Sequence, residues 1–296
     1  MRITLKQLEV FIAIAKTENM SQAAGTLHLT QSACSMALST LEKQLNSILF
    51  DRHNKRLSLN ERGRFLLPKA ISITTQMQDL QDSMMENNKE SLSGHLIIGA
   101  SLTIGNYLFP KIVGNFVTLH PEVKISLKIS NTESIIQQLL KFDIDLAIVE
   151  GGCHYDEIEA LTWGKDELVV ITSPSDPLTK KNKITRQDLS SSRWILREVG
   201  SGTREHFDLA FGGKIEPFLE LGHHEAIKQA VKNRLGISCL SKVTVAKEIQ
   251  NKELTILKTP FLKLTRNFYL LLHKDKYRTA LLNEFIKTSK PFFDSL

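Results

Sequence analysis

Several hydroxyl-bearing residues stand at the ends of apolar segments in the second half of this chain, where they could hold a small anion. Ser101 and Thr103 follow one such segment, Thr132 follows another, and residues 200–203 (GSGT) precede a predicted helix. Hydroxyl groups and the free N–H groups of a helix N-terminus both donate hydrogen bonds to anions. The candidate ligand contacts are Ser101, Thr103, Asn131, Thr132, Glu150, Ser201, Gly202, Thr203 and Arg204. Singly, each is better explained as a helix cap, but their convergence at strand ends favours a small polar or anionic ligand.

One acidic candidate, Glu150, conflicts with this interpretation. It follows the apolar segment 144–149, so its carboxylate would stand beside the anion and repel it. A salt bridge to Arg204 or His223 would resolve the conflict, and the sequence leaves both partners open.

Three other groups of residues could carry catalysis, but each lacks a part that its reaction needs. Cys153 and His154 are adjacent and have no third residue to orient them. His223 and His224 lack the i, i+4 spacing of a metal site on a helix. The run at 200–204 (GSGTR) does not match the nucleophile elbow G-x-S-x-G. We therefore expect neither an enzyme nor a metal or cofactor site.

The three cysteines, Cys34, Cys153 and Cys239, show no spacing typical of disulfides or zinc. A thiol-based redox sensor stays open as an alternative, although the sequence indicates neither a lowered thiol pKa nor a resolving partner.

Strands and helices alternate around the anion-binding candidates. Strands are predicted at 95–100, 123–129, 144–149, 168–172, 194–196, 218–221, 236–240 and 267–273, and helices at 106–119, 132–142, 225–233 and 278–292. This alternation predicts an α/β fold with parallel, doubly wound sheets. We expect lobe I at 92–164 and 264–296, lobe II at 165–263, and the ligand between them at the carboxyl ends of the strands.

Residues 21–45 predict two helices joined by a tight turn. Ser21 is the expected N-cap of the first helix, which ends near Leu27, and Thr30 caps the second. The second helix has an apolar face made by Cys34, Leu38, Leu41 and Leu45. Its opposite face is polar and could enter a DNA major groove, although an ordinary solvated face would look similar.

The flanking residues favour DNA. Leu5, Leu8, Ile12 and Ala15 predict a third helix, and residues 49–59 predict a two-stranded wing with a basic tip. Residues 1–64 contain nine Lys and Arg but only five Asp and Glu, an excess typical of nucleic-acid partners. The predicted DNA contacts are Ser21, Gln22, Thr30, Gln31, Ser32, Ser35, Ser39, Arg52, Lys55 and Arg56.

A long helix is predicted from Asn60 to about Asn88. Apolar residues recur at alternating steps of four and three, at Leu66, Ala70, Ile73, Met77, Leu80 and Met84. One apolar stripe on a polar helix needs a partner, so we expect a second subunit and a homodimer or homotetramer. Packing against its own chain is the alternative.

The quoted residues resemble the winged helix-turn-helix of LysR-type transcriptional regulators. The resemblance rests on Ser21, Ala23, Ala24, Leu27, the run Thr30-Gln31-Ser32-Ala33, Ser35, Leu38, Leu41, Leu45 and Leu49-Phe50-x-Arg52. It implies a DNA-binding domain (1–59), a dimerising linker helix (60–91) and an effector domain similar to a periplasmic binding protein (92–296). Asn46 and Asn60–Gly63 depart mildly from the usual pattern of the family.

The second half resembles the CysL/YeiE-like branch of that family, which is tied to sulfur metabolism. The segments ASLTIGNYLFP, VEGGCH and WILREVGSGTRE carry this similarity. It implies sulfite as the effector, with Ser101, Thr103, Thr132, Ser201 and Thr203 as contacts. A different small polar metabolite is the alternative.

The composition fits this class of protein. The chain is 42% hydrophobic and carries a net charge of +6, so it can form real cores. No apolar run approaches the roughly 20 residues that a membrane helix needs, and the N-terminal residues do not resemble a secretion signal. We expect a soluble cytoplasmic protein whose partners are promoter DNA, itself and a small effector, with no membrane.

Overall fold

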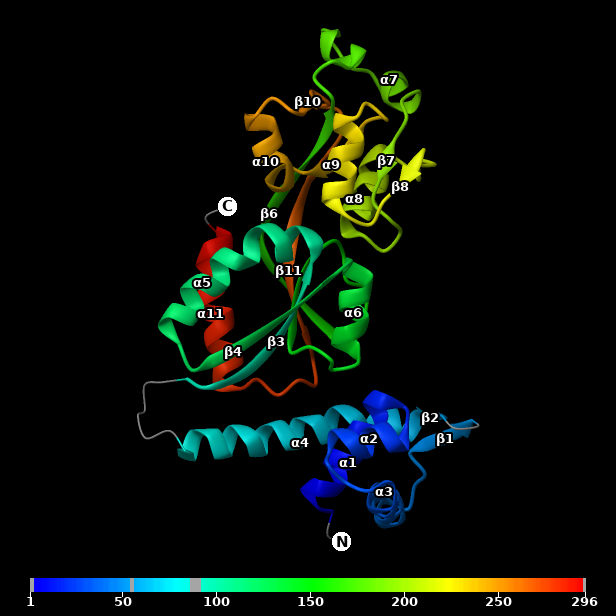
Figure 1. Ribbon diagram of the computed structural model, residues 1–296, viewed down its shortest axis with the longest axis vertical. Helices are drawn as coiled ribbons and strands as arrows, with labels where there is room; N and C mark the ends of the chain where they lie inside the picture. The colour runs from blue at the N-terminus through cyan, green and yellow to red at the C-terminus, as the bar shows by residue number, and fades with distance from the viewer. Residues whose placement is uncertain (1–2, 54–55, 86–91, 295–296) are drawn as a thin grey trace. The chain divides into compact units, whose positions relative to one another are not determined.

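The computed structural model describes residues 3–53, 56–85 and 92–294 (Figure 1). It divides into two compact units, one of residues 1–93 and 274–283 and the other of residues 94–273 and 284–296. Within the described ranges, no helix has the length and apolar character needed to cross a membrane.

The N-terminal unit is built on three helices, α1 (Leu5–Thr17), α2 (Met20–Thr26) and α3 (Gln31–Leu45). As predicted, α3 buries Cys34, Leu38 and Leu41. The expected stripe on α1 was partly wrong, because Phe11 and Ile14 are fully buried whereas Ile12 and Ala15 are only partly covered. The core therefore follows the i, i+3 row of Leu8, Phe11 and Ile14.

The helix caps explain where α2 and α3 begin. Thr30 caps α3 as predicted, since its hydroxyl accepts the N–H of Ala33 at 3.2 Å. Ser21 is not the cap of α2. Asn19 has that role, because its side-chain oxygen accepts the N–H groups of Ser21 and Gln22 at 2.9 and 3.1 Å.

The wing and the long helix follow. Strands β1 (Phe50–His53) and β2 (Arg56–Leu59) pair antiparallel, and α4 runs over Glu61–Met85. Asn60 caps α4 as predicted, accepting the N–H of Gly63 and donating to the carbonyl of Ile48, each at 2.9 Å. The predicted end of this helix near residue 88 lies outside the described residues.

The apolar stripe of α4 has a buried first part and an exposed second part. Ala70 is fully buried and Leu66 packs against the core of the same unit. The later stripe residues are exposed in the single chain, at 49% for Ile73, 58% for Leu80 and 79% for Met84.

The effector unit contains one long sheet with the order β10-β6-β11-β5-β3-β4. Its strands are β3 (Gly94–Ser101), β4 (Val123–Ser130), β5 (Leu146–Glu150), β6 (Ile158–Thr172), β10 (Thr255–Leu257) and β11 (Thr265–His273). Strand β3 is parallel to β4 and β5, but β11 is antiparallel to both β5 and β6. The sheet is therefore mixed, and the expected all-parallel arrangement was wrong.

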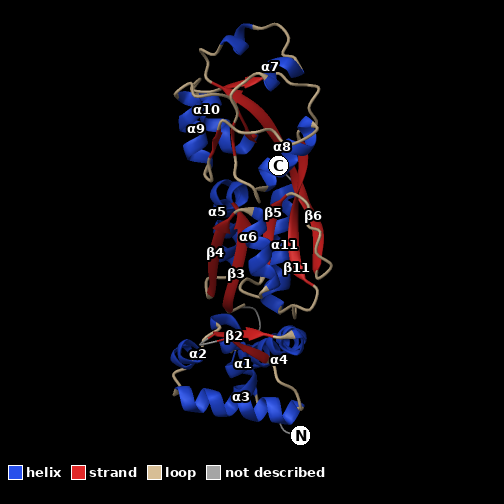
Figure 2. Cartoon of the chain, turned by 90° about the vertical axis from the view of Figure 1, so that its right-hand side faces the viewer, coloured by secondary structure: helices blue, strands red, loops and turns tan. Residues whose placement is uncertain are grey.

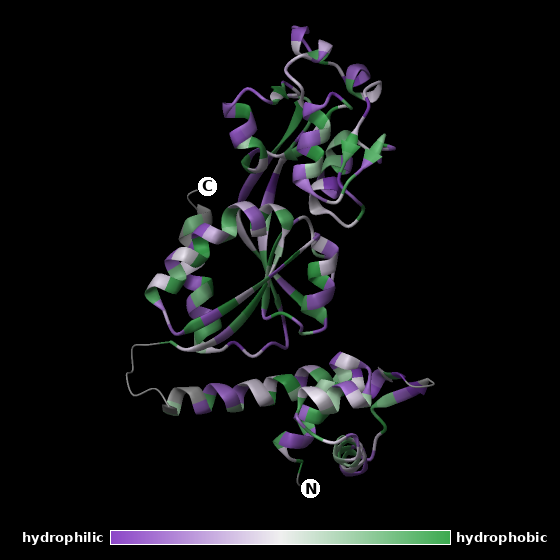
Figure 3. Cartoon of the chain, in the orientation of Figure 1, coloured by the Kyte–Doolittle hydropathy of each residue, from purple (hydrophilic) through white to green (hydrophobic). Residues whose placement is uncertain are grey.

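Helices cover both faces of the sheet in lobe I, which comprises β3–β5 with α5, α6 and α11. Helices α5 (Phe109–Leu119) and α11 (Ala280–Asp294) lie on one face and α6 (Thr132–Leu140) on the other (Figure 1). The rings of Phe116 and Phe285 join α5 to α11, with centroids 5.2 Å apart. A π-helical turn, η1 (Ile104–Leu108), precedes α5, so α5 begins at Phe109 and not at the predicted residue 106. Figure 3 shows the apolar strands enclosed between these helices.

Lobe II comprises the residues between β6 and β11. Both strands run through the two lobes (Figure 2), so they form the crossovers expected near 164 and 263. Strand β6 is longer than the predicted 168–172, and its pairing with β11 shifts register at Trp163, opposite Phe268 and Tyr269. Strands β9 (Ser238–Ser241) and β10 both pair with its second half.

The remaining elements of lobe II complete two cores around Trp194 and Ile227. They are η2 (Pro177–Lys180), α7 (Arg186–Ser190), β7 (Ile195–Leu196), α8 (Gly202–Phe211), β8 (Leu219–Glu220), α9 (His224–Lys232) and α10 (Lys242–Gln250). The sequence prediction missed η2, α7, α10 and β10.

Candidate DNA-binding and effector sites

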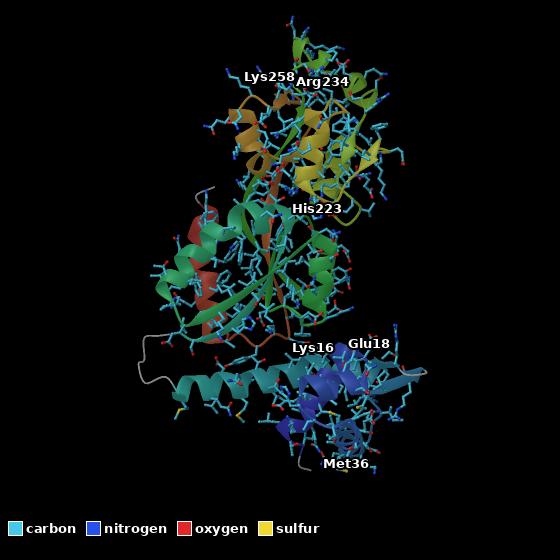
Figure 4. All side chains as sticks on the ribbon, in the orientation of Figure 1. Lys16, Glu18, Met36, His223, Arg234 and Lys258 are labelled. Atoms are coloured by element: carbon cyan, nitrogen blue, oxygen red, sulfur yellow. The ribbon has the colours of Figure 1, made fainter. Side chains whose placement is uncertain are left out.

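The polar face of α3 is free to meet a partner. Gln31, Ser32 and Ser35 are exposed and Ser39 is half-buried. Met36, labelled in Figure 4, is 71% exposed on the same helix. A helix in this position of a helix-turn-helix unit presents its first turns to the base edges of a major groove.

Two of the predicted DNA contacts also have structural roles. The Ser21 hydroxyl donates to Gln31 Oε1 at 3.1 Å and so links α2 to α3. Thr30 caps α3, and its hydroxyl lies 3.0 Å from that of Ser32. Gln22 is exposed beside them. These hydrogen bonds hold the first turn of α3 in place.

The wing places Arg52 on β1 and Arg56 on β2, and both side chains are exposed. Guanidinium groups so placed suit contacts with phosphates. Lys55, the third predicted wing contact, lies outside the described residues.

Three predicted effector residues, Ser101, Thr103 and Thr203, converge on a fourth, Glu150, in a buried cluster. The Ser101 hydroxyl donates to Glu150 Oε2, and the Thr103 hydroxyl donates to Oε1 at 2.9 Å. Thr203, from the first turn of α8, lies 3.5 Å from the same Oε1. Three of the hydroxyl groups that the sequence assigned to an anionic ligand are thus directed at a carboxylate of the protein itself.

The positive charge of this cluster comes from Arg266, which the sequence prediction missed. Arg266 Nε and Nη2 lie 2.8 and 2.6 Å from Asp166 Oδ2, and Nη1 donates to the Thr203 hydroxyl at 3.1 Å. Nη2 is 3.9 Å from Glu150 Oε1. Ser241 donates to the other oxygen of Asp166 at 2.7 Å. The signal that the sequence offered was a single arginine, Arg266, immediately before the apolar strand predicted at 267–273.

Neither expected partner of Glu150 pairs with it. His223 is exposed, and the Arg204 guanidinium is engaged elsewhere. Its Nε donates to Asp208 at 2.9 Å, and its two Nη groups donate to the carbonyls of Arg197 and Ile215 at 3.1 and 2.9 Å. Arg204 thus fastens α8 to its own lobe and directs none of these nitrogen atoms at the hydroxyl cluster.

Backbone contacts join the two lobes beside Glu150. The N–H of Gly202 donates to the Thr132 hydroxyl at 3.2 Å, and that hydroxyl donates to the Glu150 carbonyl at 3.0 Å. A Cβ atom on Gly202 would lie 2.0 Å from this carbonyl oxygen, so only glycine fits. Asn131 caps α6 by accepting the N–H of Ser134 at 2.9 Å.

Among the predicted ligand contacts that the structure describes, Ser201 is the one with a buried side-chain polar atom that makes no hydrogen bond. Its side chain is 2% exposed, it precedes α8 without capping it, and its Oγ has no hydrogen-bond partner in the described ranges. It borders a cavity of about 840 Å³ with Thr132, Gly152, Tyr155 and Leu209. A buried hydroxyl without a partner at a helix N-terminus is a place for an acceptor.

A second buried group lies on α9. Arg197 Nη1 is 2.8 Å from His224 Nε2, and because arginine can only donate, Nε2 is the acceptor and Nδ1 carries the proton. Burial, followed by the charges of Arg197, Arg266 and Lys228, holds the pKa of His224 well below its ordinary value. Lys228 itself pairs with Glu248 at 2.7 Å.

The cysteine thiols considered for catalysis and redox sensing have raised pKa values. Burial raises the pKa of the Cys153 thiol, and burial likewise raises the pKa values of Cys34 and Cys239. Raised thiol pKa values oppose the reactivity that a sensor needs. In the part of the chain that the structure describes, no three His, Cys, Asp or Glu side chains gather as a metal site.

The buried His224 predicts a pH dependence of stability. Folded His224 stays neutral while the unfolded side chain gains a proton below about pH 6.5, so stability should fall as the pH drops below that value. The loss of stability at low pH should be smaller in His224→Gln, because glutamine cannot gain a proton but keeps an acceptor for Arg197. Urea denaturation between pH 7.5 and 5.5 measures it, with the exposed His223→Gln as control. An equal pH dependence in His224→Gln and the parent would contradict the assignment.

Comparisons with known proteins match both parts of the chain to one family. Residues 5–64 match the family described as "Bacterial regulatory helix-turn-helix protein, lysR family", and residues 89–293 match "LysR substrate binding domain". The transcriptional regulator YeiE of Escherichia coli is 40% identical over 294 residues, covering 98% of each chain. CysL of Bacillus subtilis is 26% identical over 93% of this chain and 98% of its own.

A solved structure extends the likeness to the effector unit. The regulatory domain of CcmR from Synechocystis, determined in complex with 2-PG, is 30% identical, with a TM-score of 0.64 over 69% of this chain and 99% of that domain. The two family matches together cover most of the sequence. This chain belongs to the LysR family of ligand-responsive transcriptional regulators, which bind DNA and are not enzymes.

Proposed function

We propose that this regulator senses a small oxyanion, with sulfite as the first candidate, and controls sulfur-related genes in response. The oxyanion would bind between the two lobes of the effector unit, in contact with Ser201. The observation that carries this proposal is the buried Ser201 hydroxyl, which has no partner among the described residues. We expect the protein to act in the cytoplasm on promoter DNA.

The surroundings of Ser201 favour an anion. The first N–H groups of a helix have no acceptor within the helix, and the helix dipole places partial positive charge at that end. Ser201 immediately precedes the ten residues of α8. The cation of Arg266 reaches the same turn through Thr203. The related CcmR domain, solved with 2-PG, supports a ligand in this type of domain.

Ligand binding can act on the arrangement of the lobes because hydrogen bonds join them beside the proposed site. Gly202 and Gly200 of lobe II bond to Thr132 and Glu133 of lobe I at 3.2 and 3.1 Å. An anion that bonds to both lobes favours the arrangement in which both sets of donors reach it. Differential affinity of this kind is the requirement for a switch.

The first test replaces Ser201 by Ala. Loss of a hydrogen bond to a charged ligand should cost about 1.5–3 kcal/mol, raising the sulfite Kd roughly 10- to 150-fold. Calorimetry on the full-length protein measures this Kd, with the exposed Ser190→Ala as matched control. Unchanged affinity in Ser201→Ala would remove Ser201 from the site, and no sulfite binding by the parent would exclude sulfite as effector.

On the DNA side, we propose that Gln31, Ser32 and Ser35 read bases while Arg52 and Arg56 contact phosphates. All five side chains are exposed. The first three lie on the N-terminal turns of α3 and the two arginines on the strands of the wing, which supports this division. Ser21 would act by holding Gln31 in its rotamer through the 3.1 Å hydrogen bond.

Replacing Arg56 by Ala should weaken binding to specific and random DNA alike, and should reduce the slope of log K against log salt by about one. Gln31→Ala should instead reduce the difference in binding affinity between specific and random DNA sequences. Fluorescence anisotropy over a salt series distinguishes the two effects. Equal losses on both kinds of DNA in both variants would refute the division.

We also propose that the exposed part of the α4 stripe pairs with α4 of a second copy. Ile73, Met77, Leu80 and Met84 leave a row of apolar side chains uncovered in the single chain. A row spaced in this way is typical of helix pairs.

Leu80→Glu would bury a carboxylate in this interface at a cost of several kcal/mol, so it should dissociate the oligomer and abolish operator binding. Gln78→Glu, two residues away and on the opposite side of the helix, should leave both intact. Light scattering reports the mass. An oligomer that survives Leu80→Glu would place the subunit contact elsewhere.

A further inference from the structure

The Glu150 carboxylate lies close to the first turn of α8, because its Oε1 atom is 3.5 Å from the Thr203 hydroxyl. Glu150 is 1% exposed, and its two carboxylate oxygens accept hydrogen bonds from the hydroxyl groups of Ser101 and Thr103. Its backbone carbonyl oxygen accepts a hydrogen bond from the Thr132 hydroxyl. An ionised carboxylate has acceptor positions only, so any ligand that reaches Glu150 must offer a proton.

The charges around Glu150 sharpen this requirement. Arg266 makes its close ion pair with Asp166, at 2.6 Å, and its nearest approach to Glu150 is 3.9 Å. The positive charge of Arg266 is therefore already balanced by Asp166, and the close contacts of the Glu150 carboxylate are hydrogen bonds from hydroxyl groups. A fully deprotonated oxyanion would meet a buried carboxylate whose cationic neighbour, Arg266 at 3.9 Å, is already paired with Asp166, an arrangement that burial makes costly.

We propose that Glu150 is the specificity-determining residue of the effector site, and that it admits oxyanions carrying a proton while rejecting those without one. This inference rests on the proposed oxyanion site. Hydrogensulfite and hydrogen phosphate each have an O–H group that donates to Glu150, while their other oxygens accept from Ser201 and the first turn of α8. Sulfate has no proton at neutral pH, so it leaves Glu150 facing a negative oxygen atom.

The test compares sulfite, phosphate and sulfate by calorimetry on the full-length protein at neutral pH. Phosphate and sulfate have the same tetrahedral shape, so their difference reports the proton. In the parent, sulfate should bind at least roughly tenfold more weakly than sulfite and phosphate. Glu150→Gln supplies an amide donor, and it should bring the phosphate and sulfate affinities within about threefold of each other.

Glu216→Gln is the matched control, because it makes the same substitution at an exposed carboxylate of lobe II that is not among the residues bordering the cavity. It should keep the discrimination of the parent. Circular dichroism establishes that each variant is folded. Should Glu150→Gln fail to fold, Glu150→Asp, which keeps the carboxylate, must still reject sulfate, and the parent's own ratio of affinities remains decisive.

The outcomes separate the two levels of the proposal. A parent that binds none of the three anions overturns the proposed oxyanion function. A parent that binds sulfate as tightly as sulfite and phosphate leaves that function standing and overturns the role of Glu150. A folded Glu150→Gln protein that still discriminates against sulfate overturns it as well.

Discussion

The effector unit depends on the buried ion pair between Asp166 and Arg266. These residues are register partners on β6 and β11, the two strands that pass through both lobes. A buried pair is stable only when its remaining donors and acceptors are also satisfied. Ser241 serves Asp166, and Thr203 serves Arg266. Because Thr203 belongs to the first turn of α8, the ion pair holds in place the helix end beside which a ligand would bind.

A functional asymmetry follows from this constraint. Lobe I contributes Ser101 and Thr103, but both hydroxyl groups are directed at Glu150. Lobe II contributes Ser201, whose hydroxyl has no partner in the described ranges. One lobe therefore offers an acceptor and the other a donor, and a ligand that carries both kinds of group would satisfy both. Recognition of this sort specifies the chemistry of the ligand as well as its charge.

Sequence reasoning succeeded where local patterns decide the structure and failed where distant residues decide it. Thr30 and Asn60 were recognised as caps because capping involves only the next three residues. Asn19 and Ser21 are both good capping residues two positions apart, so the pattern could not choose between them. Arg266 and Asp166 are separated by 100 residues, and nothing in their spacing announces the pair. Arg204 looked like a ligand contact, but Asp208 one turn further along α8 takes its charge.

The most direct test of this account is a crystal structure of the full-length protein grown with selenite at neutral pH. Selenite carries a proton under these conditions, and the anomalous scattering of selenium locates it without ambiguity. The account predicts one strong selenium peak between the lobes, with oxygen atoms within hydrogen-bond distance of Ser201 Oγ and the Glu150 carboxylate. A peak elsewhere on the protein, with no selenium within reach of Ser201 Oγ and the Glu150 carboxylate, would contradict it.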